Sequence, residues 1–386
     1  MLESPGPDAA EAGCGPVSAT TGLRVCIDAA PENAAPNPNY NVDAAPLEEQ
    51  APAAGPITAF DAPLPDLCND SVDGWAMTRT EACRLDLRFL SLWNDRGQIV
   101  AQTTYWETSY LKTSVSNGSW TFIVELKPGF QDPIFAGTEV VPSYSEDGGC
   151  PVDDFSFPRQ LFFQGDTIAP WGEMTVRNEA FVGGISHCQG QFDYFFEIPA
   201  ASTPSTPTFA RSEDVRCDQD LKGSTTRGCV VPAFTPTLTY SRADLPEFTN
   251  HLSNALGSGL PGSPSNGPLH RMYDDTLINR NRNTATQMCQ QAVQAGGNPP
   301  VGYECDEYPF AATEEGASTG VLGRPRSFDG CYLPSLVNGV VDDGGYSVCY
   351  ISGGEGGDNP TEGGIRSSFW TANRVLDGDA FYVAVK

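Results

Sequence analysis

The chain has 386 residues, a net charge of −27, and 12 cysteines among 40 glycines and 32 prolines. This length accommodates two domains with hydrophobic cores, and no apolar run of about eighteen residues predicts a membrane span. Three histidines and no Cys-x-x-Cys pair exclude a zinc ribbon or finger. The even number of cysteines predicts disulfide bonds and an extracellular location. We expect the sequence to begin after a leader, because residues 1–5 lack the basic and apolar regions of a signal peptide.

The acidic residues are concentrated in the first part of the chain. Residues 1–233 carry 13 Lys and Arg against 32 Asp and Glu, whereas residues 234–386 carry 9 against 17. A surface of this sign repels polyanions and keeps a protein soluble. Binding of nucleic acid would therefore require a local basic groove or a bound divalent cation.

The composition divides the chain into four parts. Residues 1–66 are rich in Ala, Pro, Asp and Glu, which predicts a disordered segment because little apolar surface is available to order it. Residues 67–199 predict a β-sandwich-like domain, since segments 85–90, 120–126 and 192–198 alternate apolar and polar residues. No motif identifies a partner for this domain. Its tryptophans are compatible with sugar binding, but core packing is the favoured interpretation.

The remaining parts are a linker with a disulfide loop, residues 200–238, and a C-terminal domain, residues 239–386. The linker prediction rests on a Ser-, Thr- and Pro-rich stretch at 200–208 and on Cys217 and Cys229, which bracket a polar loop. Residues 241–244 have the form of a capping box, and the apolar spacing that follows predicts a helix ending at Gly257.

Further helices and strands are predicted along the C-terminal domain. The pattern predicts a helix over 284–294, strands over 346–351 and 379–385, and a short helix over 364–373. The cysteines suggest two disulfide bonds within this domain, Cys289–Cys305 and Cys331–Cys349. Two more are suggested earlier in the chain, Cys14–Cys26 and Cys217–Cys229. Cys68, Cys83, Cys150 and Cys188 remain to connect the β domain.

Asp306 and Glu307 are two adjacent carboxylates in a stretch typical of a strand. The segment 305–311 reads CDEYPFA, and 313–317 reads TEEGA. Adjacent strand residues point to opposite faces, and a strand end with solvated acids is an equally good interpretation from chemistry alone. Arg280 and Arg282 lie upstream, either as solvated surface residues or as contacts to phosphate, whose oxygens an arginine fork matches.

These segments resemble the NucA/NucB family of secreted bacterial deoxyribonucleases. The similarity continues through GDN at 357–359, SSFW at 367–370 and RVLDGDAFYV at 374–383, and it covers the region from about residue 239 to the end. The resemblance implies the strand–strand–helix layout of ββα-metal nucleases. We therefore expect an α+β chain in which a β-sandwich-like domain precedes a small ββα-metal nuclease-like domain.

The family pattern implies the roles of particular residues. No histidine follows His270, so Asp306 is expected to be the general base or the carboxylate that orients water, with Glu307 beside it. Asn359 is the expected ligand of Mg²⁺ or Mn²⁺, with Asp358 as the alternative ligand. Glu307 and Glu315 are further candidates for positioning metal or water.

The predicted function is a secreted, metal-dependent endonuclease that hydrolyses DNA phosphodiester bonds with little sequence preference. Arg280 and Arg282 would bind substrate phosphate, and we expect a monomer. The alternative is an extracellular, disulfide-stapled binding protein in which the nuclease-like domain is inactive.

Overall fold

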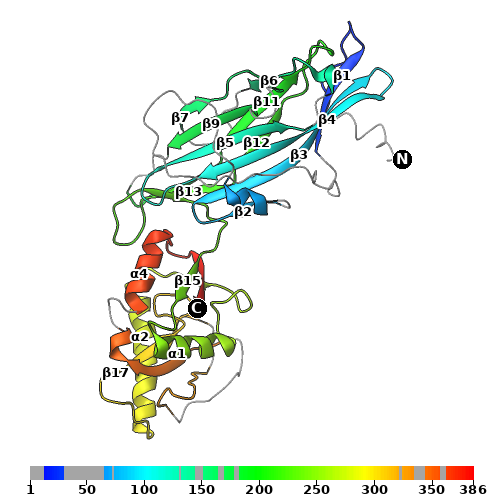
Figure 1. Cartoon of the computed structure of the whole chain (residues 1–386). Helices are drawn as coiled ribbons and strands as arrows, with labels where there is room; N and C mark the ends of the chain where they lie inside the picture. Colours follow the sequence, from blue (N-terminus) through cyan, green and yellow to red (C-terminus); the bar gives the residue numbers. More distant parts are fainter. Residues whose placement is uncertain are drawn as a thin grey trace. The chain divides into compact units, whose positions relative to one another are not determined.

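The computed structural model describes residues 13–29, 65–71, 74–129, 132–143, 151–163, 169–177, 182–320, 324–333, 344–356 and 362–386. The fold is mixed α and β and consists mainly of strands (Figure 1). It divides into two compact units. The first contains residues up to Asp218 together with Arg227–Pro232, and the second contains Gln219–Thr226 and Ala233–Lys386. None of the described helices is long and apolar enough to cross a membrane.

The first unit is built on a curled antiparallel sheet of seven strands in the order β1-β3-β4-β5-β9-β7, with β2 paired to β3. Its strands are β1 (Leu23–Ala29), β2 (Ala76–Met77), β3 (Glu81–Asn94), β4 (Ile99–Lys112), β5 (Ser119–Pro128), β7 (Val152–Ser156) and β9 (Trp171–Arg177). The predicted strands at 85–90 and 120–126 lie in β3 and β5. In β5 the alternation arises because one face of the strand packs in a core, as the 2% exposure of Trp120 shows. In β3 the alternating apolar residues Leu85, Leu87 and Phe89 are only half-buried.

Two smaller sheets complete this unit, with orders β12-β11-β6-β8 and β10-β13-β14. Their strands are β6 (Glu139–Ser143), β8 (Gln160–Leu161), β10 (Ile185–Cys188), β11 (Gln191–Glu197), β12 (Thr208–Arg211), β13 (Val215–Asp218) and β14 (Gly228–Val230). Short 3-10 helices span Asp66–Asp70 and Pro133–Phe135. Side chains of the seven- and four-stranded sheets share one hydrophobic core. The third strand predicted from alternation, 192–198, coincides with β11.

The predicted boundaries of this unit differ from the observed ones. Strand β1 pairs with β3 over seven residues, although residues 1–66 were predicted to be disordered. Strands β12 and β13 lie within 200–238, the predicted linker, and pair with β11 and β10. The backbone groups of β1, β12 and β13 are hydrogen-bonded to neighbouring strands, and the composition of a segment does not reveal such pairing.

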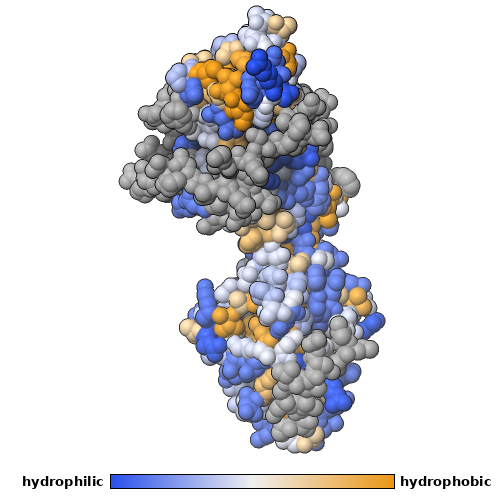
Figure 2. All heavy atoms as spheres, turned by 90° about the vertical axis from the view of Figure 1, so that its right-hand side faces the viewer, coloured by the Kyte–Doolittle hydropathy of each residue, from blue (hydrophilic) through white to orange (hydrophobic). Residues whose placement is uncertain are grey.

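The second unit combines helices with two small sheets. Its elements are β15 (Thr237–Tyr240), α1 (Pro246–Gly257), β16 (Leu269–His270), α2 (Asp275–Gln294), β17 (Tyr303–Tyr308), β18 (Ser347–Ser352), α3 (Gly353–Gly356), α4 (Glu362–Ala372) and β19 (Ala380–Val385). Strands β15-β19-β16 form one sheet, and β17 and β18 form an antiparallel pair. On the face that Figure 2 shows, the surface of this unit is mainly hydrophilic, with hydrophobic atoms in small patches.

Several predictions for this unit are confirmed, and two are corrected. Helices α1 and α4 and strands β18 and β19 match the predicted segments within a few residues. Helix α2 begins at Asp275, nine residues before the predicted start. The predicted capping box is wrong, because the N-cap residue of α1 is Leu245 and no side chain of the cap bonds the helix.

Disulfide bonds connect elements in both units. The predicted pairs Cys14–Cys26, Cys217–Cys229, Cys289–Cys305 and Cys331–Cys349 are all present. Cys68 bonds Cys83, and Cys188 is also disulfide-bonded. Cys150 lies outside the described residues.

Candidate active site

The β17–β18 pair carries the two carboxylates that the sequence singled out. Asp306 and Glu307 of β17 face Cys349 and Val348 of β18 in the strand register. The neighbouring Cys305 bonds Cys289 of α2, which fixes the strand against that helix. This framework limits the motion of the strand that bears the carboxylates.

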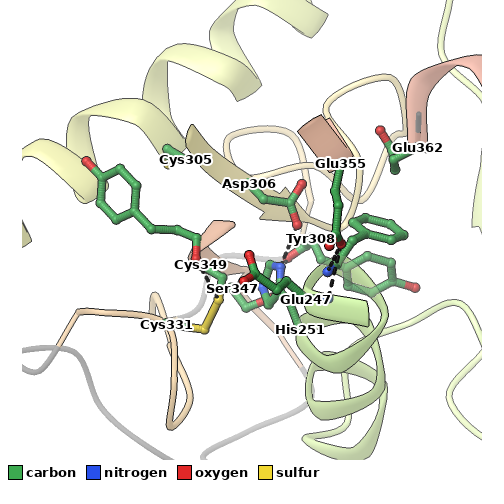
Figure 3. Close-up of polar contacts among 12 residues, drawn as sticks. Glu247, His251, Cys305, Asp306, Tyr308, Cys331, Ser347, Cys349, Glu355 and Glu362 are labelled. Atoms are coloured by element: carbon green, nitrogen blue, oxygen red, sulfur yellow. Dashed lines mark hydrogen bonds and ion pairs between the residues drawn. A yellow bond between two sulfur atoms is a disulfide. The ribbon is translucent and has the colours of Figure 1, made fainter. Parts of the chain in front are cut away.

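Asp306 forms a hydrogen-bonded pair with a buried histidine (Figure 3). His251 Nδ1 lies 2.6 Å from Asp306 Oδ2, and His251 Nε2 lies 2.9 Å from the hydroxyl oxygen of Ser347. The side chain of His251 is 0% exposed and that of Asp306 is 15% exposed. The imidazole therefore holds one carboxylate oxygen in place, while the carboxylate itself remains accessible to solvent.

Glu307 lies in a cluster of opposite and like charges. Burial raises the pKa of Glu307 to about 7, and the charge of Asp306 adds to this rise; Arg366 and Arg282 partly oppose it. A carboxylate with a pKa near neutrality suits general-base chemistry at neutral pH.

Arg366 and Glu362 form an ion pair beside these carboxylates. Burial by itself lowers the pKa of Arg366, but the carboxylates of Glu362, Asp306 and Glu307 raise it overall. Burial also raises the pKa of Glu362, whose carboxylate accepts a hydrogen bond from Tyr240 at 3.1 Å. Three carboxylates thus act electrostatically on one buried guanidinium.

Two glutamates fix the helices around this cluster. Glu355 of α3 accepts hydrogen bonds from the backbone N–H groups of Glu247 and Phe248 at 3.0 and 2.9 Å, and so caps α1. Glu247 of α1 in turn accepts from the N–H of Ser352 at 2.7 Å and from the hydroxyl of Tyr303 at 2.6 Å. We call this reciprocal arrangement the Glu247–Glu355 clasp. It connects α1, which carries His251, to β17 and to the end of β18.

The arginines suggested for phosphate binding lie on α2. Arg280 and Arg282 are exposed, and Arg282 is the nearer to the carboxylate cluster, since its charge affects the pKa of Glu307. Arg271, in contrast, is buried, and its guanidinium lies 4.2 Å from the ring centre of Trp370. Arg271 is therefore a packing residue.

Glu315 lies in a different group from Asp306. Its carboxylate accepts from the backbone N–H of His270 at 2.9 Å and lies 2.7 Å from His270 Nδ1. Among the described residues, His270, Glu314 and Glu315 form the group that could hold a metal ion, because their possible ligand atoms lie within 4.8 Å of one another. Glu314 is exposed. The predicted metal ligands Asp358 and Asn359 lie outside the described residues, directly after α3.

The sequence interpretation missed three residues of the site: His251, Glu362 and Arg366. It considered histidines only after His270, whereas His251 reaches Asp306 from a helix 55 positions upstream. One available signal was the position of His251 three residues after Phe248, on the apolar side of α1. Arg366 and Glu362 are four residues apart, a spacing that places both on one helix face.

One comparison with known proteins covers part of this site. No curated protein and no solved structure matches the chain. The deoxyribonuclease NucA/NucB family matches residues 265–384, a region that includes β17, β18 and α4 and begins after His251. The C-terminal part of the chain is therefore similar to the deoxyribonuclease NucA/NucB family.

Proposed function

We propose that the C-terminal unit is a metal-dependent endonuclease that hydrolyses phosphodiester bonds of DNA with little sequence preference. The observation that carries this proposal is the Asp306–His251 pair on β17, because it provides an oriented carboxylate next to Glu307, a residue of raised pKa. The order β17, β18, α3 and α4 supports the strand–strand–helix layout of ββα-metal nucleases.

Asp306 and Glu307 are the proposed catalytic carboxylates. His251 donates to Asp306 and so orients its free oxygen toward a water molecule or a metal ligand. Glu307, with its pKa of about 7, accepts the proton of the attacking water. Two carboxylates with different environments can divide these roles between them.

Asp306 would provide an oxygen ligand for a hard divalent cation, because carboxylate oxygens are the ligands that Mg²⁺ and Mn²⁺ prefer. Asp306 would hold Mg²⁺ or Mn²⁺ together with Asn359, or with Asp358 in its place. When bound, the cation neutralises charge on the scissile phosphate and on the leaving oxygen.

Arginines would bind the substrate. Arg366 would contact the scissile phosphate, whereas Arg280 and Arg282 would contact phosphates beyond it. Contacts to phosphate position DNA without reading its sequence, which agrees with little sequence preference. The local cations also offset the repulsion expected from a chain of net charge −27.

Secretion is the second part of the proposal. The described residues contain five complete disulfide bonds, which persist in oxidising compartments. An extracellular enzyme would meet DNA as free polymer.

Electrophoresis of the protein through a gel that contains DNA tests the activity. After refolding, the wild-type protein is expected to clear DNA in Mg²⁺ or Mn²⁺ and to leave it intact in EDTA. The Asp306→Asn variant should leave DNA intact in both. A folded wild-type protein that clears no DNA with either metal would instead favour a binding protein with an inactive nuclease-like domain.

A further inference from the structure

The segment from α1 to the start of β17 is poor in acidic residues. Residues 248–303 contain two acids, Asp274 and Asp275, and three arginines, in a chain with 49 Asp and Glu against 22 Lys and Arg. From residue 276 to residue 303 there is no acid at all. The long helix of the C-terminal unit therefore differs in charge from the rest of the molecule.

Both acids in this segment already have structural partners. Asp274 is the N-cap of α2 and accepts from the backbone N–H groups of Thr276 and Leu277 at 2.8 and 3.1 Å. Asp275 pairs with Lys222 at 2.7 Å. These contacts stabilise the first turn of α2 and neutralise the end of the helix where a negative charge would otherwise repel phosphate.

The outer face of α2 presents amide and guanidinium groups to solvent. Its exposed side chains include Asn279, Arg280, Asn283, Gln287 and Gln291, which recur at spacings of three and four. They lie opposite the buried residues of α2, such as Ala285 and Cys289. We call this surface the α2 outer face. An open hollow of about 560 Å³ lies along it, lined from Asp275 to Gln287.

The two arginines of α2 are available for a ligand. Within the described part of the chain, no carboxylate lies within ion-pair distance of Arg280 or Arg282, whereas Arg159, Arg177 and Arg366 each have one. Arg282 also acts electrostatically on Glu307 of β17, the strand that a disulfide bond connects to α2.

We propose that the α2 outer face is the docking surface for the sugar–phosphate backbone of a DNA duplex. The inference rests on the proposed nuclease function and says where the duplex binds. The acid-free part of the helix is about 28 Å long, which equals the axial rise of about eight base pairs of B-form DNA. Amide groups donate to phosphate oxygens without a net charge, so they suit an acidic protein that must release its product.

The first test measures binding without turnover. Fluorescence anisotropy of a labelled 20-base-pair duplex in EDTA compares the full-length protein with Arg280→Gln and Gln287→Glu. Each variant is expected to bind about fivefold more weakly at low salt, and Arg280→Gln should lower the slope of log affinity against log salt by about one. Gln102→Glu is the matched control for Gln287→Glu, because Gln102 is exposed on β4 and the substitution adds the same negative charge away from α2.

The second test separates docking from chemistry. With Mg²⁺, the α2 variants are expected to raise KM for plasmid DNA. The wild-type protein is also assayed with bis-p-nitrophenyl phosphate, an ester too small to reach along the helix. Unchanged duplex affinity in both α2 variants, or an equal loss in Gln102→Glu, would overturn the docking surface. A wild-type protein that binds duplex through α2 but cleaves neither substrate would contradict only the proposed function.

Discussion

At the scale of single residues, the site depends on how buried groups set the chemistry of two neighbouring carboxylates. Asp306 accepts from a histidine that has no exposed surface, and Glu307 lies among charges that act on its pKa in both directions. Asp306 and Glu307 are both carboxylates on one strand, but their surroundings differ, and this difference supports separate roles for them.

Replacement of His251 tests its role in positioning Asp306. His251→Leu removes the donor to Asp306 Oδ2, and a hydrogen bond to a charged group contributes about 1.5–3 kcal/mol. We expect kcat for DNA cleavage to fall roughly 10- to 100-fold, with KM within about twofold. His251→Gln retains a donor and should recover part of kcat. Equal loss in both variants at unchanged thermal stability would argue against the positioning role.

Glu307→Gln is expected to abolish DNA cleavage and to raise the stability of the folded protein above neutral pH. The pKa of Glu307 is raised from 4.5 to about 7, so the folded state binds this proton more tightly than the unfolded state does. The contribution of Glu307 to stability is therefore lost as the pH rises from 4.5 to 7.

The neutral glutamine does not titrate, so the variant should melt at a higher temperature than the wild type at pH 8 and at a similar temperature at pH 4. It should also lose DNA cleavage. Melting curves at the two pH values provide the measurement, and a variant less stable than the wild type at pH 8 would contradict the assigned burial.

At the scale of elements, helices α1 and α3 stabilise one another through the Glu247–Glu355 clasp. Each glutamate accepts from backbone N–H groups of the other segment, and α1 lacks a side-chain cap of its own. The predicted capping box, residues 241–244, is wrong because the hydrogen bonds that cap α1 come from Glu355, which lies 108 positions after Glu247.

Glu355→Ala should destabilise the C-terminal unit by about 1 kcal/mol, as loss of an N-terminal cap does. Cleavage should weaken as well, since α1 holds His251. Asp244→Ala is the matched control, because Asp244 lies in the predicted capping box and is exposed. Thermal unfolding of both variants measures the difference, and an equal effect of the two would contradict capping by Glu355.

The strands and helices that the sequence predicted are those with a clear period. Strands β5 and β11 alternate because one face of each is buried, and α1 has apolar residues at helical spacing. The first half of α2 lacks such a period, since the buried Asn281 occupies a core position. Its amide bonds the loop after β17, including Ala311 O at 2.9 Å and Ser318 N–H at 2.8 Å. These long-range partners cannot be inferred from spacing.

Some residues of the candidate site could also be predicted from the sequence, and others could not. Asp306 and Glu307 were identified through a local motif, and the disulfide bond to Cys305 through the order of elements. His251 and Arg366 come from α1 and α4, which the fold brings to β17. Residues that act through tertiary contacts leave little trace in one sequence.

At the scale of the whole molecule, the C-terminal unit has its own core and includes residues before the region that resembles nucleases. Strand β15 pairs with β19 in parallel, and Leu238 is 1% exposed. A fragment that begins at Ala233 keeps this strand, whereas one that begins at Thr239 loses Leu238 and half of β15.

We expect the fragment of residues 233–386 to fold and to cleave DNA, and the fragment of residues 239–386 to be less stable by about 2–5 kcal/mol, the cost of deleting a buried leucine side chain. Urea unfolding and plasmid cleavage measure the two properties. A folded 233–386 fragment that cannot cleave would show that residues before Ala233 supply part of the site.

The central claim is that Asp306 and its neighbours form a metal-dependent centre for DNA hydrolysis. The most direct measurement is the rate of plasmid nicking by the full-length protein and by Asp306→Asn, each with Mg²⁺, with Mn²⁺ and with EDTA. The account predicts nicking by the wild type with either metal, none in EDTA, and a rate at least about 1,000-fold lower for Asp306→Asn, equivalent to about 4 kcal/mol in the barrier. Cleavage by folded Asp306→Asn within about tenfold of the wild type would contradict it.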